Sequence, residues 1–469
     1  MKDCLKKKGY SDRQIKEIEA IYQSQQKKYG LVFECHKEEA EMKSETQTLS
    51  LEEIKDREIK LGESNSPQHL LIEGDNYESL KLLQTTHQGK VDVIYIDPPY
   101  NTKNKFKYSD NYGHHSKWLS FMSKRLILAK ELMSEDGVIF ISIDDNEFAQ
   151  LKLLCDEVFG YENSIATLPW VSNLKGRPLD KYFSGVHEYV LIYAKNEKKI
   201  KFDKLLVTDE KILKKYEFQD DFSFYKKGHN FLNSDSKFNI KTRPNLVYSI
   251  YINKQTLEVT CVDEKYTDEN GDLVLDEFNH FGENYYKIIP PVRKTNKLRG
   301  CWRWQIETFL EKYSTEIIFS EVEKGKLFIK DRLSVDGVKK TLPKSIIYEK
   351  NINTNAGTNL LTSILGDKMF DSPKPVELLN YLLKLVPSKD FLILDFFAGS
   401  GTTGHAALEL NQEDGGNRQF ILCTNNENNI CKDITYERLK RVITGYTTPK
   451  GKEVEGIPAN LKYLKTKWN

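Results

Sequence analysis

The sequence predicts an α/β fold whose parallel sheet is interrupted, along the chain, by an inserted module of a different kind. Strand-like apolar runs alternate with helical stretches in residues 69–195, and the same alternation returns after residue 366. Between them, residues 196–365 are rich in Tyr, Phe, Asn and Lys and show little regular hydrophobic period. With 469 residues, the chain is long enough for about three domains.

The composition sets wide limits on location and partners. Lys and Arg number 70 and Asp and Glu number 69, so the net charge of +1 does not by itself indicate a nucleic-acid partner. No apolar run is long enough to span a bilayer, and the first residues lack the apolar core of a signal peptide, which predicts a cytoplasmic protein with no membrane partner. The seven cysteines are scattered without a CxxC pair, so we expect reduced thiols and no metal site.

Residues 1–68 are charged and helix-prone, and we expect an N-terminal helical region there. Ser11 is suited to cap a helix, apolar residues follow it at helical spacing, and Gly30 ends the pattern. From residue 69 the pattern predicts the first half of the α/β domain, which covers residues 69–195. Its strands are expected at 70–74, 91–96, 137–143 and 188–194, and a helix at 117–135 joins two of them.

The second half of the α/β domain is expected over residues 366–469. We expect helices at 374–386 and 402–410, strands at 391–395 and 419–424, and an edge strand at 460–466.

A glycine-rich turn joins the strand at 391–395 to the helix that follows it. Gly399, Gly401 and Gly404 form a GxGxxG pattern in the strand–turn–helix context of a nucleotide site. Glycines permit a tight turn and a close ligand, and the helix N-terminus offers free N–H groups. Glu427 follows at about the spacing of an acid that binds ribose hydroxyls. The pattern fits any adenosine-containing ligand, and a tight turn without a ligand is the alternative.

The strand at 91–96 runs directly into the sequence Asp97-Pro98-Pro99-Tyr100. Each proline fixes its own φ and drives the preceding residue toward an extended conformation, so this turn is stiff. The Asp97 carboxylate and the Pro98 carbonyl are then two fixed acceptors for the hydrogens of an exocyclic amine, while the Tyr100 ring offers a plate for a flat base. Such acceptors would localise the nitrogen lone pair for attack on a methyl sulfonium. The alternative is a Pro-Pro turn capped by the aspartate.

The two motifs, in this order, resemble the β class of amino-group DNA methyltransferases, which carry DPPY, then a target-recognition domain, then FxGxG. Here FxGxG runs from Phe397 to Gly401. Further stretches, among them LLIEGDN, HEYVLIYAKN and MFDSPKPVELL, make the chain most similar to the modification subunits of type III restriction–modification systems. The resemblance implies a Rossmann-like class I methyltransferase fold with permuted motif order, in which residues 196–365 form an inserted α+β target-recognition domain.

The resemblance also implies S-adenosylmethionine as the cofactor and a catalytic role for Asp97, Pro98, Pro99 and Tyr100. Cofactor contacts can then be assigned to individual positions. Asp395 would hydrogen-bond the amino group of the cofactor, Glu427 would bind its ribose, and Asp75 would lie near its adenine. The methionine part would be wrapped by the FxGxG residues, and one further segment would lie at the same pocket: Phe397, Gly399, Ser400 and Gly401, with Lys374 and Pro375.

Double-stranded DNA is the implied substrate, and its target adenine must be flipped out of the helix to reach such a site. The inserted module would read the sequence, and residues 171–350 carry 33 basic against 27 acidic residues. Basic side chains there are candidates for contacts to phosphates or guanine edges. The candidates are Arg243, Arg293, Lys294, Arg299 and Arg303. A solvated basic loop beside core tryptophans is the alternative.

These features together predict a site-specific adenine-N6 DNA methyltransferase. Cytosine N4 stays open as the target because it is also an exocyclic amine, although Asp at the first motif position favours adenine in the family. Cytosine C5 is disfavoured, since it requires a cysteine nucleophile and no Pro-Cys pair occurs. The other candidates are a non-catalytic DNA-specificity subunit for a partner nuclease, and an NAD-dependent oxidoreductase, which would leave DPPY unexplained.

The resemblance suggests two further partners, a restriction subunit and a second copy of the chain. Many type III modification subunits continue well past the segment that matches residues 460–466, whereas this sequence ends at Asn469. The resemblance therefore does not by itself carry over the roles that the family gives to such an extension, in subunit pairing and in docking of a restriction subunit.

Overall fold

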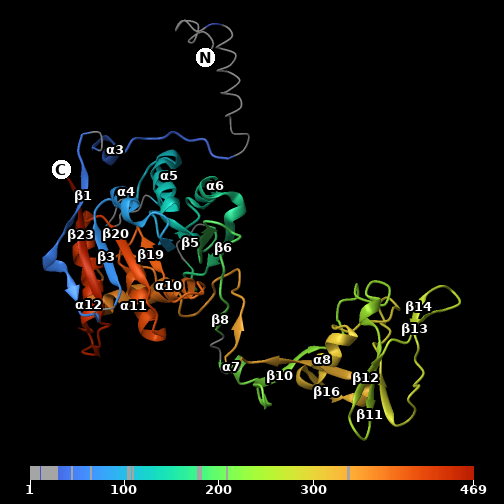
Figure 1. The fold of residues 1–469 in the computed structure, drawn as a ribbon. Helices are drawn as coiled ribbons and strands as arrows, with labels where there is room; N and C mark the ends of the chain where they lie inside the picture. Colours follow the sequence, from blue (N-terminus) through green and yellow to red (C-terminus); the bar gives the residue numbers. More distant parts are fainter. Residues whose placement is uncertain are drawn as a thin grey trace. The chain divides into compact units, whose positions relative to one another are not determined.

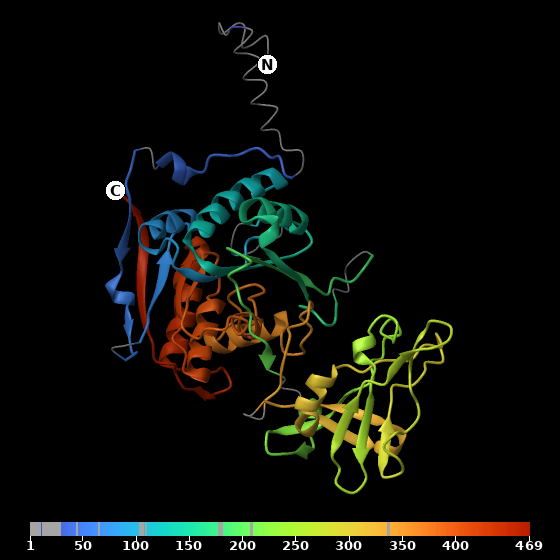
Figure 2. The same cartoon turned by 45° about the vertical axis from the view of Figure 1, so that its right-hand side comes forward.

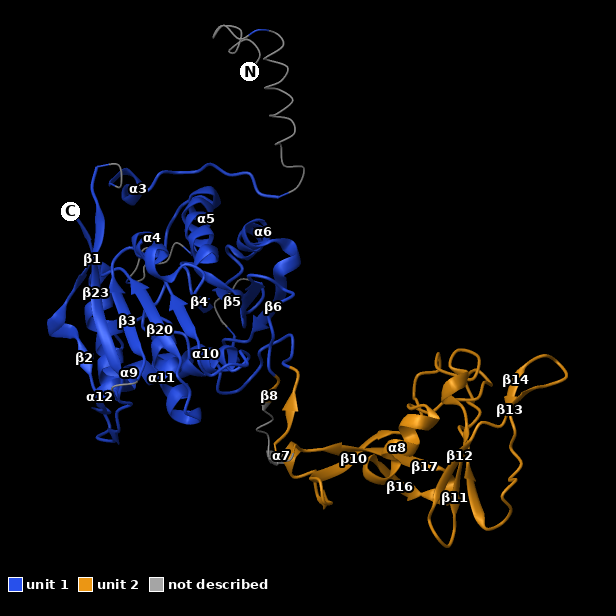
Figure 3. Cartoon of the chain, in the orientation of Figure 1, with its two compact units in different colours: residues 1–203, 343–469 blue, residues 204–342 orange. Residues whose placement is uncertain are grey.

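The computed structural model describes residues 11, 30–43, 46–63, 66–102, 107, 110–176, 182–206, 210–334 and 338–469. The helix expected after Ser11 lies outside the described residues. The chain divides into two compact units (Figure 3). The first unit combines residues 1–203 with 343–469, and the second unit is residues 204–342.

The first unit is built on one large mixed sheet (Figure 1). Within the described residues, ten strands form it in the order β1-β23-β3-β20-β19-β4-β5-β7-β6, with β2 also paired to β23. Neighbours from β23 to β5 are parallel, whereas β1, β7 and β6 pair antiparallel with their neighbours. The strands are β1 (Leu49–Glu53), β2 (Ile59–Lys60), β3 (Gln68–Glu73), β4 (Val91–Ile96), β5 (Met133–Ile143), β6 (Ser164–Trp170), β7 (Glu188–Ala194), β19 (Leu392–Asp395), β20 (Gln419–Thr424) and β23 (Asn460–Trp468).

Two groups of helices cover opposite faces of this sheet (Figures 1 and 2). The first group is α4 (Asn76–His87), α5 (His115–Leu132) and α6 (Phe148–Phe159), and the short α3 (Glu39–Lys43) precedes β1. The second group is α9 (Thr354–Leu365), α10 (Val376–Leu383), α11 (Thr402–Asp414) and α12 (Glu437–Thr444). A short ribbon of β21 (Tyr446–Thr447) and β22 (Glu453–Val454) follows α12. This two-sided cover explains why the central strands are apolar along their whole length.

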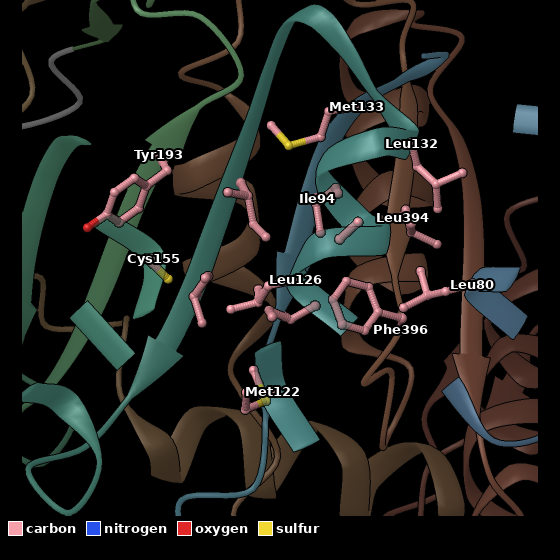
Figure 4. Packing of buried hydrophobic residues seen from close by; sticks show 14 of the residues in the cluster. Leu80, Ile94, Met122, Leu126, Leu132, Met133, Cys155, Tyr193, Leu394 and Phe396 are labelled. Carbon is pink, nitrogen blue, oxygen red and sulfur yellow. The ribbon is translucent and has the colours of Figure 1, made fainter. Parts of the chain in front are cut away.

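One buried part of the core of the first unit lies between the sheet and the first helix group. Ile94 of β4 and Leu394 of β19 belong to one buried cluster with Met122 and Leu126 of α5 (Figure 4). Burying one such side chain contributes about 1.5–3 kcal/mol relative to leaving it in water. The cluster holds β4 and β19 firmly side by side, and the residues that follow these two strands form the site described below.

The expected edge strand at 460–466 forms as β23, but the prediction that it lies at an edge is wrong. β23 pairs with β3 on one side and with β1 and β2 on the other. The described part of residues 1–68 therefore contains two strands as well as α3, rather than helix alone. Leu49 and Leu51 alternate with polar residues, which suits a strand with one solvated face.

The second unit is rich in strands and aromatic side chains. Its core gathers Phe231, Tyr248, Trp302 and Phe309, all buried, so these aromatic residues serve packing. The elements are β8 (Leu205–Leu206), α7 (Glu210–Leu213), β9 (Phe218–Gln219), β10 (Phe224–Asn230), β11 (Ser249–Asn253), β12 (Val259–Val262), β13 (Lys265–Thr267), β14 (Leu273–Leu275), β15 (Tyr285–Ile288), α8 (Ile306–Glu316), β16 (Ile317–Glu321), β17 (Lys326–Arg332) and β18 (Lys340–Thr341).

This compact unit is shorter than the module of residues 196–365 expected from the sequence. Residues 343–365 belong to the first unit. Hydrogen bonds tie their backbone there, among them those from Trp170 Nε1 to Ile352 O at 2.9 Å and from Arg441 Nη1 to Ile364 O at 2.7 Å. Among the described residues, none of the helices combines the length and the apolar character that crossing a membrane requires.

Candidate active site

A cavity of about 460 Å³ opens in the first unit, where the parallel strands end. Its size lies in the range of small-molecule sites. Residues of both sequence motifs line it. Eleven of the thirteen predicted catalytic and cofactor residues do so: Asp75, Asp97, Pro98, Pro99, Tyr100, Lys374, Asp395, Phe397, Gly399, Ser400 and Glu427. Gly401 and Pro375 are not among the lining residues.

The two motifs meet because β4 and β19 are adjacent and parallel. Ile393 is in register with Val93, and Leu394 with Ile94. The residues that follow the two strands therefore leave the sheet at the same edge, although they are 300 positions apart in the chain. In open α/β sheets this edge is where ligands bind.

Hydrogen bonds at Pro99 and at Asn101 hold the turn after β4 rigid. Trp118 Nε1 donates to the carbonyl of Pro99 at 2.7 Å, whereas the Pro98 carbonyl accepts no hydrogen bond from the described residues. Asn101 follows with a left-handed backbone, φ 58°. Its N–H donates to Asp110 Oδ1 at 2.8 Å and its amide to Glu147 Oε1 at 2.7 Å. The Pro98 carbonyl is thus a fixed and available acceptor.

Asp97 belongs to a cluster of charged and phenolic groups. Lys374 Nζ lies 2.9 Å from Asp97 Oδ2 and 3.4 Å from Glu188 Oε2. The Tyr100 hydroxyl donates to the same oxygen of Glu188 at 3.0 Å, and the ammonium group lies 5.0 Å from the centre of the Tyr100 ring. The Asp97 Oδ1 atom is buried and has no hydrogen-bond partner. Four side chains from three separate segments thus fix the geometry around one carboxylate.

Burial and charge act in opposite directions on this cluster. Burial raises the pKa of Asp97 above its usual value, and the Lys374 ammonium opposes that rise. Burial alone would lower the pKa of Lys374, but the carboxylates of Asp97 and Glu188 raise it well above the ordinary lysine value. Lys374 is therefore a permanent cation beside two carboxylates.

The glycine-rich turn after β19 presents backbone to the cavity. Asp395 ends the strand and accepts hydrogen bonds from Thr403 Oγ1 at 2.6 Å and from the N–H of Phe397 at 3.0 Å. Burial nevertheless raises the pKa of Asp395 to about 7. Gly399 and Gly401 both have positive φ, 50° and 77°, which side chains disfavour. A Cβ on Gly401 would lie 3.2 Å from Thr435 Cγ2, so this glycine faces the supporting helix.

That turn rests on a buried arginine of α12. Arg438 Nη1 donates to Thr402 Oγ1 at 2.8 Å and lies 3.3 Å from the carbonyl oxygen of Ser400. Burial lowers the pKa of Arg438 to about 10, so it stays charged at neutral pH. Thr435, in the π-helix Ile430–Tyr436, donates to Gly399 O at 2.6 Å. Thr435 and Arg438 therefore preorganise the loop, and the N–H groups of Phe397, Ala398 and Gly401 donate within the protein, to Asp395 Oδ1, Cys423 O and Ala398 O.

Asp75, Glu427 and Pro375 are the remaining predicted cofactor residues, and of the three Asp75 and Glu427 line the cavity. Asp75 caps α4 by accepting from the N–H of Tyr77 at 2.8 Å, and it lies 3.4 Å from the buried guanidinium of Arg125. Glu427 begins a short 3₁₀ turn, Glu427–Asn429, directly after β20. Pro375 is the N-cap of α10 and orients that helix.

Sequence reasoning did not identify Glu188 or Arg438 as parts of the site. A signal for Glu188 was present, since it is a charged residue at the start of the otherwise apolar strand β7. β7 runs antiparallel to β5, with Tyr189 opposite Ile143, so its first residue lies at the edge where the parallel strands end. Arg438 gives no such signal, because its burial depends on how α12 packs under the turn.

The five basic residues proposed for DNA contacts lie in the second unit. Three of them hold backbone carbonyls there: Arg293 that of Ser234, Arg299 that of Pro290 and Arg303 that of Asn230. These three arginines therefore have hydrogen-bond partners within their own unit. Arg243 and Lys294 are exposed. DNA contact by any of the five stays a prediction.

The sheet order and the two motifs at one cavity define a Rossmann-like methyltransferase fold with permuted motif order. Residues 91–437 match the N6/N4 methyltransferase family model described as DNA methylase, and the chain belongs to this family. The predicted fold class and family are thereby confirmed.

Curated relatives extend over most of the chain. The EcoPI Mod subunit of a type III restriction–modification enzyme, from Escherichia phage P1, is 35% identical over 395 residues, which are 78% of this chain and 58% of the relative. The type II methyltransferase M.KpnI from Klebsiella pneumoniae is 33% identical over 84% of this chain and 89% of its own length. The EcoP15I Mod subunit from Escherichia coli is 32% identical over 76% of this chain and 58% of the relative. The chain thus spans less than two thirds of the Mod subunits.

Proposed function

We propose that this chain transfers a methyl group from S-adenosylmethionine to the exocyclic amine of a base in double-stranded DNA, with adenine N6 as the target. One observation carries the proposal: Asp97 of the DPPY motif and the Gly399–Ser400 turn of the FxGxG motif line the same cavity. Methyl transfer from a cofactor to a base requires that both are bound side by side. A hydrogen-bond acceptor for the amine of the base and a nucleotide-binding turn for the cofactor, at one cavity, meet this requirement.

The residues at the cavity fit the cofactor on two independent grounds. The left-handed Gly399 gives a ligand close access to the turn, and a Cβ added there would already lie 3.4 Å from Phe370 Cζ. Asp395 offers a carboxylate for a cationic amino group, and Glu427 offers one for hydroxyls. The cofactor, when bound, supplies an electrophilic methyl group on a sulfonium; the chain's own residues orient it and exclude water.

For the base, the site offers acceptors and a stacking ring. A base inside a duplex cannot enter such a cavity, so the target must be flipped out. The Asp97 carboxylate and the Pro98 carbonyl would each accept a hydrogen bond from one N–H of its amino group, and the Tyr100 ring would stack on its face. Both acceptors act most strongly as positive charge builds on the nitrogen during attack, which is when they lower the barrier.

Two alternatives keep the same fold. Cytosine N4 presents the same amine chemistry, and nothing in the cluster of Asp97, Lys374 and Glu188 distinguishes the two bases. A non-catalytic specificity subunit for a nuclease is disfavoured, because pure DNA binding requires neither the buried Asp97–Lys374 pair nor the preorganised turn. Since several relatives are Mod subunits, a restriction subunit is proposed as a partner. A homodimer and a cytoplasmic location stay predictions.

The test is direct methylation of DNA by the purified chain. Plasmid DNA incubated with S-adenosylmethionine and read by long-read sequencing should carry methyladenine at one short motif, and Asp97→Ala should leave most of these sites unmodified after the same incubation. Methylcytosine at N4 would select the first alternative. Cofactor-independent, sequence-specific DNA binding with no modified base in any motif would select the second.

A further inference from the structure

We propose that Lys374 is the counter-ion of Asp97 during transfer, and that Glu188 receives its ammonium group when the target amine binds Asp97. The inference rests on the proposed methyl transfer. It moves Lys374 from the cofactor side of the cavity, where the family resemblance put it, to the base side. It also gives Glu188 a role that the sequence did not suggest.

The first step of the argument is where the ammonium group lies. Lys374 comes from the segment before α10, yet its Nζ contacts carboxylates that follow β4 and begin β7. Its side chain is 10% exposed, as is that of Glu188. A buried cation with two carboxylate partners at 2.9 and 3.4 Å is held by charge, and removing it would leave two buried anions unpaired.

The second step concerns the two oxygens of Asp97. Oδ1 is buried, while the side chain as a whole keeps 30% exposure. The accessible side of the carboxylate is therefore that of Oδ2, the atom that Lys374 contacts. An incoming amine must approach the same oxygen, so the ammonium group has to share it or move.

The third step is the place to which the ammonium group can move. Glu188 Oε2 already lies 3.4 Å from Nζ, so a small side-chain rotation transfers the closer contact from Asp97 to Glu188. The Tyr100 hydroxyl holds Glu188 in place for this at 3.0 Å. Thr402 Oγ1 donates to the backbone carbonyl of Lys374 at 3.2 Å, so the lysine is anchored while its tip is free to shift.

The charges around Asp97 give this arrangement a pH signature. The Lys374 ammonium group favours the ionised form of Asp97, whereas the Glu188 carboxylate disfavours the ionised form of Asp97. Tyr95, Tyr100 and Asp395 also face the carboxylate; both phenols have a raised pKa and are neutral at working pH. Asp97 must be ionised to accept the amine. Removing Lys374 therefore moves the acid limb of the rate profile to higher pH, and removing the charge of Glu188 moves it to lower pH.

The experiment measures single-turnover methyl transfer against pH with saturating DNA and S-adenosylmethionine. Lys374→Met should move the midpoint of the acid limb of the rate–pH profile up by about one to three pH units. At a pH below both midpoints, the rate of the variant should therefore be about 10- to 1,000-fold lower than that of the wild-type protein. Glu188→Gln should lower the limb by roughly one pH unit and also reduce the plateau, because Lys374 loses its second site. Lys374→Arg should restore part of the rate. Lys384→Met and Glu413→Gln, from an exposed ion pair between the C-cap of α10 and helix α11, are matched controls and should keep the wild-type profile.

A second measurement does not depend on activity. NMR of protein labelled at the aspartate carboxyl carbons follows the titration of Asp97, whose signal is assigned by its loss in Asp97→Asn. The pKa of Asp97 read from this titration should be higher in Lys374→Met and lower in Glu188→Gln. Unshifted titrations and acid limbs in both variants would overturn the inference. So would a Lys374→Met protein that loses cofactor affinity while its limb stays in place. If Lys374→Met does not fold, the near-isosteric Glu188→Gln decides alone. A wild-type protein that methylates no DNA would instead refute the proposed function, and the carboxyl titrations would still test the ion cluster.

Discussion

At the scale of single residues, Asp97 separates binding from chemistry. Asp97→Ala removes the charge-assisted acceptor, and because the lost interaction is strongest in the transition state, single-turnover transfer should fall by roughly 10²–10³-fold or more. Cofactor affinity, measured by calorimetry, should change little, since the Gly399 turn is held from the opposite side by Thr435 and Arg438. Near-normal transfer by the variant would show that the DPPY turn is only a stiff loop.

Asp395 should show a conflict between function and stability. Its pKa in the folded protein is about 7, above the ordinary value of 3.8. A raised folded pKa means that the stabilising contribution of this group is complete below about pH 4 and is lost as the pH rises through 7. Asp395→Asn should therefore raise the melting temperature by a few degrees at pH 8.5 and by less at pH 5.

The same substitution should have the opposite effect on ligand binding. The wild-type protein should bind S-adenosylmethionine more tightly as Asp395 ionises through pH 7, because the carboxylate then faces a cationic amino group. Asp395→Asn should bind it more weakly and without this step. Calorimetry at pH 6 and pH 8 separates the two effects. If the affinity of Asp395→Asn for S-adenosylmethionine still rises between pH 6 and pH 8 as in the wild-type protein, Asp395 does not contact the cofactor.

At the scale of elements, one helix glycine sets the position of the lysine. Gly357 lies inside α9, and a Cβ added to it would lie 2.3 Å from Pro373 O and 2.9 Å from the carbonyl carbon of Lys374. Glycine to alanine in an unpacked helix usually stabilises by about 0.5–1 kcal/mol. Here the backbone that carries Lys374 would have to move, so the free energy of unfolding should fall by about 1–3 kcal/mol.

The displaced segment should also slow the reaction, by about 10-fold or more, since small misplacements at a reacting centre are costly. Chemical denaturation and single-turnover transfer measure the two effects of Gly357→Ala. Asn359→Ala, on the exposed side of the same helix, is the control and should alter neither. A Gly357→Ala protein that is more stable and fully active would mean that the segment before α10 adapts without moving Lys374.

Elements with a strong apolar pattern were predictable, and those set by pairing were not. The expected strands 91–96, 188–194 and 419–424 coincide with β4, β7 and β20, because buried strands read as continuous apolar runs. β1 and β2 carry charged residues and exist because β23 offers them an edge. The motif residues of the site were visible in the sequence for chemical reasons. The partnership of Lys374 with Glu188 was not, since it depends on strand order and helix packing across the chain.

At the scale of the whole molecule, the first and last strands of the second unit pair with each other. β8 and β18 pair antiparallel, with Lys340 opposite Leu206, so the chain enters and leaves this unit at neighbouring positions. We therefore predict that residues 204–342 can be exchanged for the equivalent unit of a relative without disturbing the large sheet. The chimaera should keep cofactor affinity and methylate a different motif, as read by long-read sequencing.

A chimaera that binds the cofactor and still methylates the original motif would assign sequence recognition to the first unit instead.

Exposed basic residues offer a finer test. Arg243→Ala should weaken DNA binding if it contacts phosphates. Lys254→Ala removes an exposed lysine of the same unit, whose ammonium group lies 4.8 Å from the centre of the Tyr286 ring, and serves as comparison. Equal affinities for both variants would leave Arg243 without a role in binding.

The order of strands in the large sheet has a consequence for how the protein is made. β3 and β4 follow each other in the sequence, yet β20 and β19 lie between them in the sheet. On the ribosome, β4 therefore emerges 300 residues before its partner strand, taking the register of Val93 with Ile393. Until then the edge of β4 that pairs with β19 has no native partner, although β5 and α5 can already cover its other edge and one face, and an unpaired strand edge is a site at which nascent chains aggregate. The second unit is translated within that interval, so slow codons within residues 204–342 would lengthen the dependence of the nascent chain on chaperones.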